Sequence, residues 1–144
     1  MKSAIPFVMA LLIGAFSLSA QARDDRLKFP IADAMSGVQE QLGDTVRFYF
    51  SGRKAPGASH TFGTFTSNKK TNFFNKSDKA GCERAFASAM LSLRDRALKE
   101  GGDAVIDIHS VYKGDEFKSA TEYECGAGTI MGGVALRGTV VKLH

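Results

Sequence analysis

The sequence predicts an α+β domain in which an antiparallel sheet packs against one long helix, with a short N-terminal helix and one disulfide. Three observations predict this class. Residues 78–100 repeat apolar side chains at helical spacing. Several shorter segments on either side alternate apolar and polar side chains, as strands do. The chain has two cysteines, and an even number favours a bridge between them.

The first 22 residues have the three parts of a secretory signal peptide. Lys2 supplies a positive charge, the run from Ile5 to Leu18 is apolar, and Ala20-Gln21-Ala22 has small residues where signal peptidase cleaves. The apolar run is too short to span a bilayer, which disfavours the alternative of an uncleaved anchor. We expect a signal peptide over residues 1–22 and a single α+β domain over residues 23–144. This domain is expected to be periplasmic or secreted, without stable membrane insertion after cleavage.

Three elements are predicted before the long helix. Residues 31–42 repeat apolar side chains at helical spacing, Pro30 suits a first helical turn, and Gly43 would end the helix. Residues 45–50 alternate and predict a strand, and residues 60–66 predict a second, weaker strand.

Residues 68–77 are polar and basic around two adjacent phenylalanines. This segment is a candidate binding loop, because basic side chains interleaved with aromatic ones suit contacts with phosphates and bases. The candidate partner-binding residues are Lys69, Lys70, Phe73, Phe74 and Lys76. The alternative is an ordinary surface loop whose phenylalanines tuck under the domain.

The long helix is the best-defined element of the sequence. Ser77 can cap it, Asp78 complements the positive end of its dipole, and Gly101-Gly102 supplies the stop. Its apolar stripe is expected to face the sheet and consists of Cys82, Ala85, Phe86, Ala89, Met90, Leu93 and Ala97.

Three strands are predicted after the long helix. Residues 104–111 and 120–125 alternate and are expected to form a hairpin, and residues 134–143 form a last strand. The four glycines between residues 126 and 133 predict a bulged or kinked segment before that strand.

Cys82 and Cys125 are predicted to form a structural disulfide. In an oxidising compartment a pair of cysteines most simply forms a bridge. The closed loop of about 44 residues corresponds to roughly 4 kcal/mol in the chain-entropy model. The spacing of the two cysteines does not match the C-x-x-C pattern of redox-active thiols.

A hairpin that turns near Gly114-Asp115 would gather Asp107, His109, Glu122 and Glu124 on its outer face. One register places His109 opposite Glu122 and Asp107 opposite Glu124. Carboxylates and an imidazole are ligands for zinc or manganese, so these four residues are the candidate metal site. The alternative is an acidic face that is solvated or neutralised by nearby lysine and arginine side chains.

Short motifs in the last 80 or so residues carry a family resemblance. They are Gly81-Cys82, Gly-Gly-Asp-Ala-Val at 101–105, Tyr-Glu-Cys-Gly-Ala-Gly at 123–128, and Ala-Leu-Arg-Gly-Thr-Val-Val at 135–141. These motifs resemble the signalling domain of the Rcs envelope-stress sensor lipoprotein and related small domains named for heavy-metal binding. The match is closer to a group of small exported proteobacterial proteins, some of them labelled "excinuclease ATPase subunit".

The resemblance implies that the fold carries over with one bridge between Cys82 and Cys125. Two departures limit what else it implies. The stress sensor has a lipidated cysteine and two disulfides, whereas this chain has neither a lipid site nor further cysteines, so tethering and signalling do not carry over. The chain also has no G-x-x-x-x-G-K-[ST] loop, so the ATPase label has no phosphate-binding motif to support it.

The sequence predicts no catalytic residues. There is no G-x-S-x-G motif, and His109 and Ser110 are strand neighbours whose side chains point to opposite faces. The formal net charge of +4 is a mild excess without a concentrated stripe, so nucleic acid is not an expected partner.

We therefore expect a non-catalytic, exported periplasmic accessory or binding module that needs no cofactor. It is expected to act by binding another envelope component, with an envelope protein as the expected partner. The alternative is a periplasmic protein that binds or responds to a divalent metal.

Overall fold

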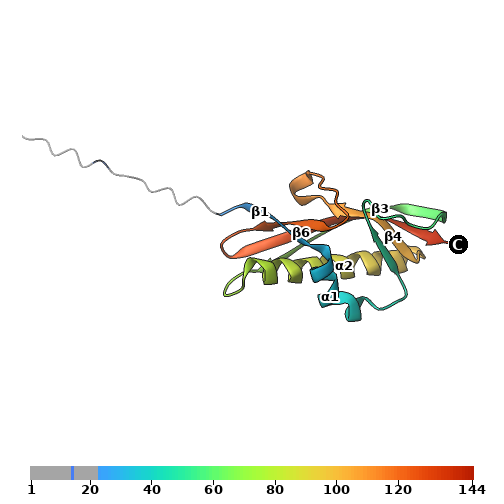
Figure 1. Ribbon diagram of the computed structural model, residues 1–144, viewed down its shortest axis with the longest axis horizontal. Coiled ribbons are helices and arrows are strands. Elements are labelled where there is room, and N and C mark those ends of the chain that lie inside the picture. Colours follow the sequence, from blue (N-terminus) through green and yellow to red (C-terminus); the bar gives the residue numbers. More distant parts are fainter. Residues whose placement is uncertain (1–13, 15–22) are drawn as a thin grey trace, which may run out of the picture.

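The computed structural model describes residue 14 and residues 23–144 (Figure 1). Within residues 23–144, two helices lie on one face of a six-stranded mixed sheet. The α+β class is confirmed, whereas the expectation of an antiparallel sheet is wrong in part. The predicted signal peptide over residues 1–22 lies outside the described residues except for Gly14. No helix formed by the described residues is long and apolar enough to cross a membrane.

The elements of the described chain follow one another in this order: β1 (Asp25–Pro30), α1 (Ile31–Leu42), β2 (Arg47–Phe50), β3 (Ala58–Asn72), α2 (Asp78–Glu100), β4 (Ala104–Ser110), a 3-10 turn (Tyr112–Gly114), β5 (Glu122–Ala127) and β6 (Met131–Leu143). Two of them differ from the expectation. Periodicity does not predict β1, because only Leu27 and Phe29 alternate with its charged residues. β3 continues through residues 68–72, where the sequence predicts a loop. Polar residues fit in this part of the strand because its outer face is open to solvent.

Both predicted helices are confirmed. Ser77 Oγ accepts a hydrogen bond from the Ala80 amide at 3.1 Å and caps α2, and Gly101 ends it in the left-handed region with φ of 87°. The predicted stripe is buried against the sheet. Helix α1 packs beside α2, where Lys79 Nζ donates to Asp33 Oδ2 at 2.7 Å.

Strand β6 is the centre of the sheet. Strand β3 pairs with it along its whole length, while its other edge pairs with β5 at Gly132 and Gly133 and with β4 between residues 136 and 141. Strand β1 lies beyond β5, and β2 lies beyond β4. β2 and β4 are parallel because α2 carries the chain back across the sheet between them. This crossover makes the sheet mixed.

The predicted hairpin of residues 104–111 and 120–125 is wrong. Strands β4 and β5 both pair with β6 rather than with each other. The segment between them, residues 111–121, folds over the outer face of the sheet, opposite the helices (Figure 1). Its Tyr112 packs on Gly126, where a Cβ atom would lie 1.9 Å from Tyr112 Cζ. Glycine at position 126 therefore allows the segment to lie flat on the sheet.

The disulfide joins α2 to β5. Cys82 Sγ and Cys125 Sγ lie 2.08 Å apart, and both residues are fully buried. The predicted pairing is confirmed. Beside it the rings of Phe86 and Tyr123 pack with their centroids 4.5 Å apart, so the bridge lies in the aromatic part of the core.

Candidate functional site

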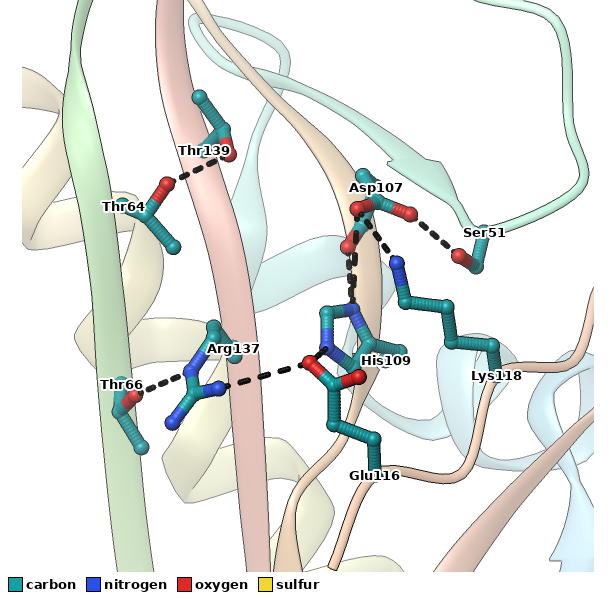
Figure 2. Close-up of polar contacts among 9 residues, drawn as sticks. All are labelled: Ser51, Thr64, Thr66, Asp107, His109, Glu116, Lys118, Arg137 and Thr139. Carbon is teal, nitrogen blue, oxygen red and sulfur yellow. Dashed lines mark hydrogen bonds and ion pairs between the residues drawn. The ribbon is translucent and has the colours of Figure 1, made fainter. Parts of the chain in front are cut away.

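Asp107 lies at an irregularity in β4, on the outer face of the sheet. The register of β4 against β6 shifts between Ile106 and His109, and Asp107 has a φ of 52°. Few residues other than glycine adopt this conformation, and it marks a bulge that redirects the side chain. The Asp107 carboxylate accepts hydrogen bonds from Ser51 Oγ and, at 3.1 Å, from Lys118 Nζ (Figure 2).

These contacts keep Asp107 ionised. Partial burial acts to raise the pKa of Asp107, but the hydrogen bonds from Ser51 and Lys118 outweigh it and lower the pKa below the ordinary value. Ser51 follows β2, and Lys118 belongs to the 111–121 segment. The carboxylate therefore ties both of these loops to β4.

His109 is buried two residues further along β4. Its Nδ1 lies 2.7 Å from the carbonyl oxygen of Asp107, and its Nε2 lies 3.2 Å from Glu116 Oε1 (Figure 2). A carbonyl oxygen and a carboxylate both accept hydrogen bonds. Both contacts are therefore hydrogen bonds at once only when both ring nitrogens carry a proton.

Arg137 extends this cluster across β6. Its Nη1 lies 3.5 Å from Glu116 Oε1, and its Nε donates to Thr66 Oγ1 of β3 at 3.1 Å (Figure 2). The Glu116 carboxylate thus faces both His109 and Arg137. The polar cluster, defined as Ser51, Thr66, Asp107, His109, Glu116, Lys118 and Arg137, links three strands and two loops.

The polar cluster contains the residue types of a catalytic triad in a different order. In a triad the histidine takes the proton of the serine and the carboxylate orients the histidine. Here Ser51 donates to Asp107, and His109 Nε2 faces Glu116. The geometry therefore does not prepare Ser51 for attack, and the expectation that the protein lacks catalysis stays a prediction.

The four candidate metal ligands do not meet as the predicted register requires. Asp107 Oδ2 and His109 Nδ1 lie 4.0 Å apart. Glu122 and Glu124, however, are on β5, where they pair with β1 rather than with β4. Across residues 14 and 23–144 no three histidine, cysteine or acidic side chains gather closely enough to hold a metal ion. The predicted register is wrong, and metal binding stays a prediction without this geometry behind it.

The candidate partner-binding residues lie at one end of the molecule, where β3 leads into α2. Phe73 and Phe74 separate there: Phe73 is 4% exposed and Phe74 is 67% exposed. The Phe73 ring packs on Gly132, where a Cβ atom would lie 2.2 Å from Phe73 Cζ. Lys70 is exposed, and Lys69 and Lys76 are half-buried. Of the two phenylalanines, Phe74 is thus the one open to contact.

The turn between β5 and β6 adds two apolar residues to this end. Ile130 is 61% exposed and Met131 is 49% exposed. The Phe73 amide donates to the Ile130 carbonyl oxygen at 2.6 Å, and Asn72 pairs with Met131, so the two loops are adjacent (Figure 1). Sequence reasoning missed both residues. The sequence feature that could have identified them is a pair of large apolar side chains between glycines, because a turn at the surface does not require large apolar residues.

Comparison of the chain with family models, with curated proteins and with solved structures finds no match in any of the three.

Proposed function

We propose that the protein is a non-catalytic, exported binding module that contacts another envelope component through the exposed end. The exposed end is defined as Lys69, Lys70, Phe74, Lys76, Ile130 and Met131. The observation that carries the proposal is the gathering of exposed apolar side chains on its two adjacent loops.

The apolar part of the exposed end stands out against the remaining surface. Four large apolar residues among those described are strongly exposed, and Phe74, Ile130 and Met131 are three of them. The fourth, Leu98, is 50% exposed and lies near the other end of α2. Apolar side chains exposed singly are ordinary, but a group of them marks an interaction site.

The charge of the exposed end indicates an acidic partner. Lys69, Lys70 and Lys76 form no salt bridge with any described residue. Lys76 Nζ instead donates to the Asn72 carbonyl oxygen at 2.9 Å. The charged side chains of the 111–121 segment, by contrast, form ion pairs with other parts of the protein, as Lys113 does with Asp24. A partner with an apolar patch rimmed by carboxylates or phosphates fits the exposed end.

Position-dependent crosslinking tests this proposal. A photo-crosslinking residue replaces Phe74 in one variant and Leu98 in a matched control, and both are irradiated in the cells that export the protein. Both positions are exposed and apolar, and α2 separates them by roughly 30 Å. We expect adducts at position 74 and few at position 98. Equal yields, or none at position 74, would show that this end is not the contact surface.

Charge reversal tests the basic part separately. The Lys69→Glu, Lys70→Glu, Lys76→Glu variant is expected to lose most of the adduct formed at position 74 while its melting temperature stays within a few degrees, because these side chains lie outside the core. An unchanged adduct yield in a folded variant would contradict the role of charge.

A further inference from the structure

A pocket of about 640 Å³ opens at another part of the molecule, between the start of α1, β2 and the two loops that the polar cluster ties to β4. This volume lies in the range of small-molecule sites. The pocket is lined by Pro30, Ile31, Ala32, Met35, Phe48, Tyr49, Phe50, Arg53, Lys54, Ala120 and Thr121.

The floor of the pocket is apolar and fixed. Ile31 and Phe50 are buried, and Met35 and Phe48 are half-buried. The ring of Phe50 stacks on Phe86 of α2, with the centroids 6.1 Å apart and the planes at 15°. The floor thus exposes the edge of the hydrophobic core. An apolar group of a ligand that binds there would be removed from water, which favours binding.

The rim of the pocket is cationic. Arg53 and Lys54 are exposed, and none of the described residues that line the pocket is acidic. Neither side chain forms a salt bridge within residues 23–144. The start of α1, at Ile31 and Ala32, adds the positive end of a helix dipole to the same lining. The two unpaired cations of the rim, Arg53 and Lys54, therefore favour an anion.

The backbone that carries these cations is held in place. The Arg53 amide donates to the Phe50 carbonyl oxygen at 2.9 Å, and Gly52 has a φ of 82° in this turn. A Cβ atom at Gly52 would lie 3.2 Å from Ala120 Cβ of the opposite loop. Ser51 and Lys118, which belong to the two lining loops, both bind Asp107. The polar cluster thus sets the mouth of the pocket.

We propose that this pocket binds a single-chain amphipathic carboxylate, with its apolar chain on Met35, Phe48 and Phe50 and its carboxylate at Arg53 and Lys54. An uncharged apolar molecule would leave both cations without a partner. A highly charged molecule would leave the apolar floor in water. A single anionic group on an apolar chain matches both parts of the lining. This site is separate from the exposed end and does not depend on it.

Titration calorimetry of the purified protein tests the pocket, with laurate below its micelle-forming concentration as the probe. Dodecanol and dodecyltrimethylammonium have the same chain with a neutral and a cationic head, and octanoate has the same head with a shorter chain. We expect laurate to bind at least tenfold more tightly than each of the three. Failure of laurate to bind, or equal affinity for laurate and dodecanol, would overturn the proposal.

Two charge reversals assign the binding to this pocket. The Arg53→Glu, Lys54→Glu variant is expected to lose at least tenfold in laurate affinity with an unchanged melting temperature. The matched Lys69→Glu, Lys70→Glu variant at the exposed end is expected to keep the affinity. Equal losses in the two variants would show nonspecific attraction to positive charge and would overturn the assignment. Neither result bears on the crosslinks at position 74.

Discussion

Tyr123 carries a hydroxyl group into the core beside the disulfide. The residue is fully buried between Phe86 and Phe29, and no described residue offers its Oη a hydrogen bond. Burial raises the pKa of Tyr123, because the ionised phenolate would lose its hydration. A buried hydroxyl without a partner costs stability. Removal of the Tyr123 hydroxyl group is therefore expected to stabilise the fold.

The Tyr123→Phe variant is expected to unfold at higher denaturant, with a gain of about 1 kcal/mol in the free energy of unfolding, because the ring packing stays and the unpaired hydroxyl is removed. Urea denaturation followed by circular dichroism measures the gain. Tyr112→Phe is a suitable control, since the Tyr112 hydroxyl lies 3.5 Å from Asp24 Oδ1 at the surface. A loss above about 1 kcal/mol for Tyr123→Phe would show that the hydroxyl has a stabilising contact.

At the scale of single residues the sequence singles out the basic and aromatic part of the exposed end, but it misses Ile130 and Met131 and does not show which way each side chain points. Phe73 and Phe74 are equivalent in the sequence, and only the packing of Phe73 on Gly132 decides which is buried. Ser51 joins the polar cluster from 56 residues before Asp107, and Glu116 joins it from the segment that folds over the outer face of the sheet after β4. Such meetings depend on tertiary structure, which residue spacing does not encode.

Strand β6 needs glycine where β3 passes into the exposed end. The Gly132→Ala variant is expected to lose about 1–3 kcal/mol in the free energy of unfolding, because the new methyl group would overlap the Phe73 ring. Denaturation in urea measures the loss. Displacement of Phe73 is also expected to reduce the crosslinks at position 74.

The matched control is Gly37→Ala on the exposed side of α1, where no atom of the described residues lies within 4 Å of the added Cβ atom. We expect this variant to gain about 0.5–1 kcal/mol, because alanine favours a helix interior more than glycine does. Equal changes in the two variants would contradict the packing described for Phe73.

The disulfide fastens α2 to β5, an element that forms only a short ladder with β6. Reduction, or the Cys82→Ala, Cys125→Ala variant, is expected to lower the free energy of unfolding by about 2–4 kcal/mol, since the bridge spans a sequence separation of 43 residues. The measurement is a pair of denaturation curves with and without reductant. If protein isolated from the exporting host has two thiols that react with maleimide without reduction, the bridge does not form there.

At the scale of elements both helices could be predicted because their signals are local. Caps, stop glycines and apolar spacing all lie within the segments themselves. Strand pairing is different, because an alternating pattern shows which face is buried but not which strand lies alongside. The sequences of β4 and β5 predict a hairpin between these two strands, whereas in the structure each of them pairs with β6. The metal register was inferred from that hairpin and is wrong for the same reason.

Across the whole molecule, ion pairs join the first described residues to distant elements. Arg23 Nη2 lies 2.6 Å from Asp78 Oδ2 at the start of α2, and Lys113 Nζ lies 2.5 Å from Asp24 Oδ2. The hydrogen bond from Arg23 lowers the pKa of Asp78, and the hydrogen bond from Lys113 lowers that of Asp24. With Asp107, three carboxylates thus have lowered pKa values in the folded protein.

These shifts predict the direction of the acid response. A carboxyl group with a lowered pKa in the folded state stabilises the fold fully above its ordinary value of 3.8, and this contribution is lost as pH falls through the lowered pKa. The urea midpoint is therefore expected to stay level from about pH 7 to pH 5 and to fall below about pH 4. A midpoint that does not fall below about pH 4 would contradict these pairings.

The central claim concerns where the molecule meets its partner, and hydrogen–deuterium exchange with isolated envelope fractions tests it most directly. Exchange is measured for the purified protein alone and with the envelope fraction. The account predicts slower exchange in peptides covering residues 69–76 and 128–132, with α1 and the 111–121 segment unchanged. Unchanged exchange at the exposed end, or protection confined to other segments, would contradict it.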